Sequence, residues 1–80
     1  MRKIFITASE KIINQLEKKF RHNFEIEFEY SDSLEGQIEV IKNNTWVTIC
    51  RFSLDESFDN IVTMFNVNYE IYTASNKVNI

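Results

Sequence analysis

The sequence contains no proline, and it has only one glycine, one cysteine and one histidine among its 80 residues. One glycine is too few for the glycine-rich loops that cradle phosphates in nucleotide-binding proteins. The lone Cys50 rules out an internal disulfide, and with the lone His22 it makes no metal cluster. We therefore expect a reducing compartment and a protein without a cofactor or a metal.

Long hydrophobic runs are also missing. The apolar run that follows Lys3 is much shorter than the core of a signal peptide. No stretch approaches the ~20 apolar residues that a membrane helix needs. These absences predict a cytoplasmic protein without a membrane partner, located in the bacterial host cytosol if a phage encodes it.

Catalytic patterns are absent as well. A catalytic histidine needs an orienting carboxylate and a nucleophile within reach, and no motif around His22 supplies them. Cys50 has no sequence context that would activate a thiol. The segment 31–36 (SDSLEG) is too short and too poor in ligands for a calcium loop. We expect no enzymatic activity.

What the chain does contain is enough for one hydrophobic core. Hydrophobic residues make up 44% and aromatic residues 14% of the composition, and a chain of this length forms a single domain, here over 1–80. The net charge is −3 and the isoelectric point is about 5.0. Since a general nucleic-acid binder carries a basic face, this acidity disfavours direct nucleic-acid binding and favours a basic protein partner.

Capping patterns followed by apolar residues at helical spacing predict two helices. Thr7 and Glu10 form a capping box before a helix over about 8–22, and Ser53 and Glu56 repeat the pattern before a helix over about 54–66. Alternating or short apolar runs predict strands at about 3–7, 24–30, 37–42, 45–52 and 67–73. The order β-α-β-β-β-α-β predicts an α+β fold: a single mixed, mostly antiparallel sheet with both helices packed on one face.

The hairpin over residues 37–52 fixes which side chains share a face. Asn43-Asn44 suits a two-residue turn, because asparagine tolerates positive φ. This turn pairs Ile41 with Trp46, and the register continued along the strands sets Ile38 opposite Ile49. The strand over 24–30 is expected next to the strand over 37–42.

The side chains of these strands are then divided between two faces of the sheet, because successive side chains of a strand point to opposite faces. The face under the helices is expected to carry apolar residues: Phe24, Ile26, Phe28, Tyr30, Ile38, Val40, Val47 and Ile49. The opposite face is expected to be acidic, with an apolar corner: Glu25, Glu27, Glu29, Gln37, Glu39, Ile41, Trp46, Thr48 and Cys50.

This acidic face is the candidate partner-binding site. Trp46 and Ile41 would be its anchors, since aromatic side chains dominate the energetics of interfaces. Carboxylates would steer a basic partner toward them, and those predicted to do so are Glu25, Glu27, Glu29 and Glu39. The alternative is that the face is ordinary solvated surface.

The composition adds an indication of origin. About a third of the residues are Ile, Asn or Lys, a bias that AT-rich codons produce and that points to a low-GC bacterium or its phages and plasmids. In size, acidity and composition the chain resembles phage and mobile-element inhibitors of host defence, the anti-CRISPR proteins among them. The resemblance implies an inhibitor or regulator of a nuclease or another nucleic-acid enzyme.

Two other functions stay open. A nucleic-acid-binding module with a ferredoxin-like sheet would stack bases on exposed aromatic residues. A self-assembling structural phage protein, or a homodimer, would pair through the corner at Trp46. Phosphate contacts would draw on a cluster of basic residues: Arg2, Lys3, Lys11, Lys18, Lys19 and Arg21.

Overall fold

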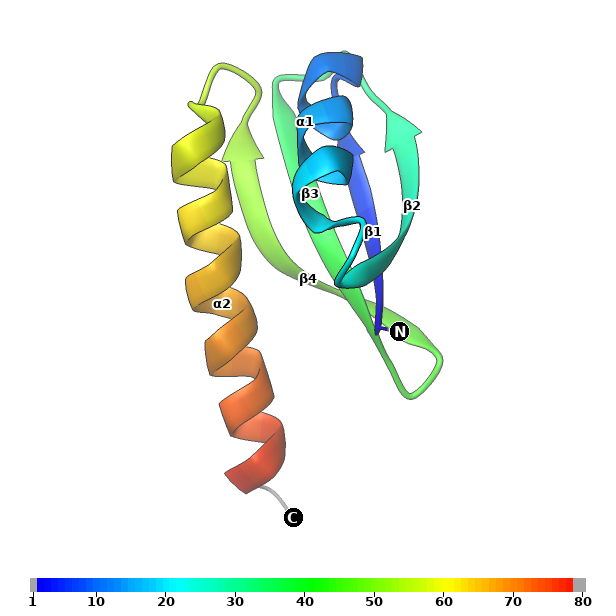
Figure 1. Cartoon of the computed structure of the whole chain (residues 1–80), viewed down its shortest axis with the longest axis vertical. Helices are drawn as coiled ribbons and strands as arrows, with labels where there is room; N and C mark the ends of the chain where they lie inside the picture. The colour runs from blue at the N-terminus through cyan, green and yellow to red at the C-terminus, as the bar shows by residue number, and fades with distance from the viewer. Residues whose placement is uncertain (1, 79–80) are drawn as a thin grey trace.

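The computed structural model describes residues 2–78, with side chains through residue 74, so the ends of the expected domain at residues 1 and 79–80 lie outside the described residues. The described residues form four strands and two helices (Figure 1). In chain order these are β1 (Arg2–Ala8), α1 (Glu10–Phe20), β2 (Phe24–Tyr30), β3 (Glu35–Lys42), β4 (Thr45–Ser53) and α2 (Phe58–Val78).

The strands form one sheet in the order β2-β1-β3-β4. β1 is parallel to β2, because α1 connects them as a crossover, whereas the β1–β3 and β3–β4 pairs are antiparallel. The predicted fold class, an α+β domain with a single mixed and mostly antiparallel sheet, is confirmed. The expected pairing of β2 with β3 is wrong, since β1 lies between them. Ile6 of β1 is the neighbour of both Phe28 and Ile38, so the expected grouping of those two side chains on one face holds.

The predicted strand over 67–73 is wrong, because α2 continues from Phe58 to Val78. Ile61, Phe65 and Tyr69 recur every fourth residue, which places them on one side of a helix. The rings of Phe65 and Tyr69 are stacked at a centroid distance of 5.5 Å, and both contact the ring of Phe24, at 5.6 and 5.3 Å. The packing of these rings therefore favours continuation of the helix over a strand.

Both helices begin later than the capping boxes predicted. The hydroxyl of Ser9 accepts a hydrogen bond of 3.4 Å from the backbone N–H of Ile12 and caps α1. The hydroxyl of Ser57 accepts a hydrogen bond of 3.2 Å from the backbone N–H of Asn60 in the first turn of α2. Thr7 and Ser53 remain in strands, because each continues the ladder of its strand.

A β-bulge in β4 alters the expected hairpin register. Asn43 and Asn44 form the turn with φ of 52° and 63°, and the pairs nearest the turn are as predicted. Beyond them Ile38 pairs with Cys50 instead of Ile49, so Ile49 is an extra residue in β4. The placement of Cys50 on the polar face is therefore wrong: the bulge turns it into the core, where it is buried.

The core lies between the helices and one face of the sheet. α1 lies over β1 and β3 on that face, and α2 runs along β4 (Figure 1). Both helices pack on one face, as predicted, and the largest fully buried side chains there are Ile4, Ile6, Ile13, Leu16, Ile38, Ile61 and Phe65. The placement of three side chains in the core is wrong: Phe28, Tyr30 and Val47 are exposed, because they lie toward the sheet's edges or the hairpin end. Ile26 and Ile49 are partly buried against the core.

Candidate functional site

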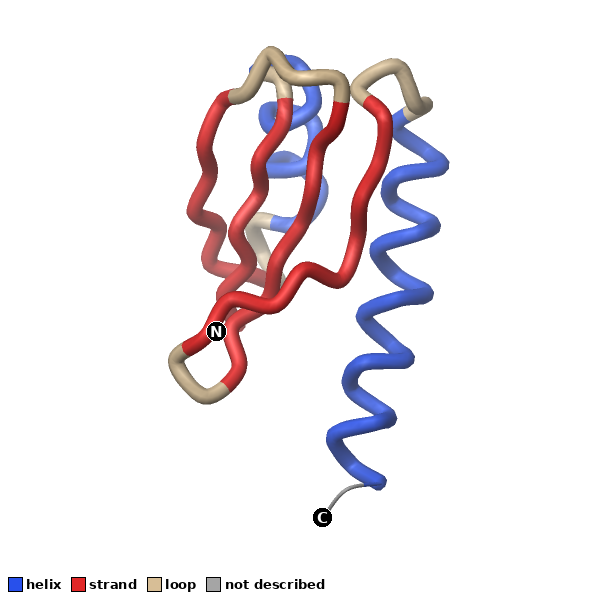
Figure 2. Tube along the Cα trace, turned by 180° about the vertical axis from the view of Figure 1, so that it is seen from behind, coloured by secondary structure: helices blue, strands red, loops and turns tan. Residues whose placement is uncertain are grey.

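The sheet face that the helices leave uncovered is the candidate site. Figure 2 shows this face toward the viewer, with α1 behind the strands. We call it the open face, and its residues are Lys3, Phe5 and Thr7 of β1, Glu25, Glu27 and Glu29 of β2, Glu35, Gln37, Glu39 and Ile41 of β3, and Trp46, Thr48, Arg51 and Ser53 of β4. Within residues 2–78, no helix covers it.

Two aromatic side chains meet on the open face. The ring centroids of Phe5 and Trp46 are 5.7 Å apart, with an interplanar angle of 59°. Such a tilted arrangement is favourable for aromatic pairs. Both side chains are half-buried, and Ile41, the cross-strand partner of Trp46, is 39% exposed. Together Phe5, Ile41 and Trp46 form an apolar patch that reaches from the hairpin to the central strand.

Carboxylates border this patch on two sides. Glu27 and Glu39 are the cross-strand neighbours of Phe5, on β2 and β3 respectively. Lys3 lies 3.8 Å from Glu27, but both side chains are about half exposed, so the ion pair contributes little. Glu39 accepts a hydrogen bond of 2.7 Å from the side chain of Gln37. The glutamates outnumber Lys3 and Arg51, the cations of this face, so it is acidic overall.

All six predicted partner-binding residues lie on the open face, and their role stays a prediction. They are Trp46, Ile41, Glu25, Glu27, Glu29 and Glu39. Sequence reasoning missed Phe5, Lys3 and Arg51 on the same face. Phe5 stands between two buried isoleucines, so its outward direction is hidden in an apolar run. Arg51 was missed because the bulge reverses the alternation after Ile49.

The thiol of Cys50 takes no part in this surface. Burial raises the pKa of Cys50 above its ordinary value, so the thiolate is disfavoured. A buried, protonated thiol is a poor nucleophile. Among residues 2–78, no group of three or more His, Cys, Asp and Glu side chains is placed to hold a metal ion.

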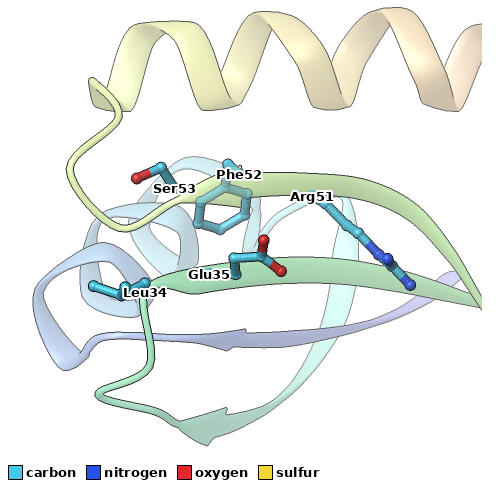
Figure 3. Close-up of a pocket in the computed structure, with 5 residues that line it drawn as sticks. All are labelled: Leu34, Glu35, Arg51, Phe52 and Ser53. Atoms are coloured by element: carbon cyan, nitrogen blue, oxygen red, sulfur yellow. The ribbon is translucent and has the colours of Figure 1, made fainter.

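An open hollow of about 380 Å³ adjoins one end of the open face, where β3 begins and β4 ends (Figure 3). It is lined by Leu34, Glu35, Arg51, Phe52 and Ser53. Leu34 is 86% exposed, and Phe52 is the buried residue of the lining. The hollow therefore has no buried polar group that would orient a small ligand, which specific ligand sites usually provide.

None of the helices in the described part of the chain has the length and apolar character required to cross a membrane. No protein-family model, no curated protein sequence and no solved structure matches the chain.

Proposed function

We propose that the protein is a small binding module that docks its open face on a basic protein in the bacterial cytosol, without catalysing a reaction. The observation that supports this most directly is the contact between Phe5 and Trp46 within a border of glutamates. Large half-buried rings provide contact area at little entropic cost, and acidic side chains around them accelerate the approach of a basic partner.

The proposal extends to the class of target. Proteins that bind nucleic acids carry basic grooves, and an acidic face can occupy such a groove in place of the phosphate backbone. The protein would then be an inhibitor or regulator of a nuclease or another nucleic-acid enzyme. The net charge of −3 and the glutamates on β2 support this choice of target.

The test combines affinity capture from a low-GC bacterial lysate with affinity measurements on the purified partner. We expect Trp46→Ala to weaken binding by more than about 1 kcal/mol, because it removes the anchor. Ile71→Ala is the control, since Ile71 is an exposed apolar residue of α2, away from the open face. Equal affinities of Trp46→Ala and the wild type for the partner would exclude the open face as its docking site.

A charge reversal tests the steering role separately. Glu29→Lys on the open face should slow association and reduce its dependence on salt. Glu70→Lys is the control, because Glu70 is an exposed glutamate on α2. If both variants slow association equally, only the net charge of the protein matters and the open face has no steering role.

A second candidate function is supported by the aromatic pair itself. Phe5 and Trp46 share the open face with Lys3 and Arg51, and single-stranded nucleic acids stack their bases on aromatic side chains beside cations. Trp46 is the only tryptophan of the chain, so its fluorescence reports directly on this face. Quenching by single-stranded oligonucleotides that steepens at low salt would favour this candidate over a protein partner.

A further inference from the structure

The two edges of the sheet are protected differently. On one edge β4 bulges at Ile49, and the carbonyl of Ile49 accepts a hydrogen bond from Asn68 of α2. A bulge and a covering helix both keep a strand edge from pairing with another chain. On the other edge lies β2, and within residues 2–78 no element lies beyond it (Figures 1 and 2). Its register with β1 is regular from Phe24 to Tyr30.

The backbone of β2 offers hydrogen-bonding groups to this free edge. The backbone N–H of Ser31 donates to the carbonyl of Ala8 at 2.8 Å, so Ser31 points toward β1. Successive residues of a strand direct their N–H and C=O groups to opposite sides. The N–H and C=O groups of Ile26, Phe28 and Tyr30 therefore point away from β1, where an added strand would meet them.

The side chains of β2 give this edge a definite pattern. On the open face lie three exposed glutamates, Glu25, Glu27 and Glu29. On the helix face Phe28 and Tyr30 are 41% and 53% exposed, and their ring centroids are 5.2 Å apart. The edge is thus acidic on one side of the sheet and apolar on the other.

We infer that β2 accepts an extended segment of a basic partner as a fifth strand of the sheet. In this segment lysine or arginine alternates with large apolar residues, because such a strand sets its cations beside the glutamates and its apolar side chains beside Phe28 and Tyr30. The inference rests on the proposed function for the basic character of the partner. It adds the binding mode and the sequence pattern of the bound segment.

The same glutamates disfavour a second copy of this chain at the edge. In an antiparallel pair of two β2 strands centred on Glu27, that residue faces its own copy, and Glu25 faces Glu29. Like charges directly opposite each other destabilise a strand pair. The charge pattern therefore selects a basic strand and rejects self-pairing.

The probe is a labelled nine-residue peptide that alternates lysine with valine, measured against the folded 80-residue protein. Binding should protect the amides of Ile26, Phe28 and Tyr30 from hydrogen exchange. One control peptide has the same composition with its lysines in one block. A second carries N-methyl groups on the residues whose N–H groups would face β2, which removes backbone pairing and keeps the charge. Each control peptide should bind about tenfold more weakly.

A pair of variants tests the edge from the protein side. Phe28→Pro removes an N–H that points away from β1, so the hydrogen bonds between β1 and β2 are kept. Edge strands tolerate proline at such positions. Phe28→Ala loses the same ring but keeps that N–H, so it is the matched control. We expect Phe28→Pro to bind the peptide about tenfold more weakly than Phe28→Ala. If Phe28→Pro fails to fold, the N-methylated peptide tests the same hydrogen bonds with the wild type.

The outcomes separate this inference from the proposed function. Equal affinity for the alternating, blocked and N-methylated peptides would overturn strand addition, because charge alone would then explain binding. Trp46→Ala should bind the peptide like the wild type, since Trp46 lies on β4. Suppose that Trp46→Ala no longer binds the natural partner, while the peptide leaves the amides of β2 unprotected from hydrogen exchange. The open-face proposal would then stand, and strand addition would be rejected.

Discussion

The side-chain amide of Asn68 donates a hydrogen bond of 2.7 Å to the backbone carbonyl of Ile49, the extra residue of the β4 bulge. A bulge leaves a backbone group without its partner in the ladder. Because Asn68 lies on α2, this bond ties the second helix to the edge of the sheet. It thus joins the two features that the sequence did not reveal, the bulge and the helical course of residues 67–73.

We expect Asn68→Ala to lower the free energy of unfolding by about 1–2 kcal/mol, because it leaves a part-buried carbonyl unsatisfied. Urea denaturation measures the change. Asn66→Ala is the control, since Asn66 is an exposed asparagine of the same helix and gains the same helix propensity. A similar free energy for both variants would show that the bond to Ile49 contributes nothing.

A second expectation concerns Gly36, which pairs with Phe52 inside the β3–β4 ladder. A Cβ atom at Gly36 would lie 2.7 Å from Cζ of Phe52, too close for a carbon–carbon contact. Gly36→Ala should therefore destabilise the protein by about 1–3 kcal/mol. Phe52 is buried, so its ring has little room to move aside.

Thermal and urea unfolding of a double-mutant cycle check this cause. Phe52→Leu removes the ring atoms that the methyl group of Gly36→Ala would meet. Gly36→Ala should therefore lower the unfolding free energy less when position 52 is leucine. If Gly36→Ala costs the same with leucine at position 52, the close approach of the ring is not the reason for the glycine.

Local patterns predicted much of this fold. The alternation of glutamates with apolar residues over 24–30 identified β2 and its two faces, and the paired asparagines identified the hairpin turn. The faces of β2 and β3 were assigned correctly even though their neighbours were not. Ile6 lies level with both Phe28 and Ile38, so inserting β1 between the strands leaves the side chains on the same faces.

Non-local packing decided what the sequence left open. Residues 67–72 alternate like a strand, yet Tyr69 also continues the helical series from Ile61 through Phe65. Its ring contacts with Phe24 and Phe65 favour the helix. The carbonyl of the bulge residue Ile49 is bonded by Asn68 from across the fold, a contact that no local pattern shows. Phe5 has apolar neighbours on both sides, so nothing in the sequence marks it as part of the open face.

Paired valine substitutions can distinguish helix from strand at residues 67–73. Val67 is 51% exposed on α2, and alanine favours helices over valine, so Val67→Ala should leave stability unchanged or raise it by up to about 0.5 kcal/mol. Val47→Ala is the comparison, because Val47 is 37% exposed on β4 and should lose stability as a strand residue. A loss of equal size at both positions in urea denaturation would favour a strand at Val67.

The buried thiol of Cys50 predicts how stability depends on pH. Burial raises its pKa in the folded state, whereas the unfolded thiol ionises near its ordinary pKa of about 8.5. Above about pH 8.5 the unfolded state therefore binds fewer protons than the folded state, and the unfolding free energy falls as pH rises toward the folded pKa. Below that pH the thiol is protonated in both states, so Cys50 adds no pH dependence to the unfolding free energy.

The measurement is the unfolding free energy of the wild type and of Cys50→Ala between about pH 7 and 10. Cys50→Ala should be less stable at every pH because it leaves a cavity, but the gap between the two proteins should narrow above about pH 8.5. All other ionisable groups are common to both proteins, so they affect the difference little. If the difference in unfolding free energy stays constant with pH, the thiolate is as stable in the folded state as in the unfolded state. That result would contradict the burial of Cys50 in the core.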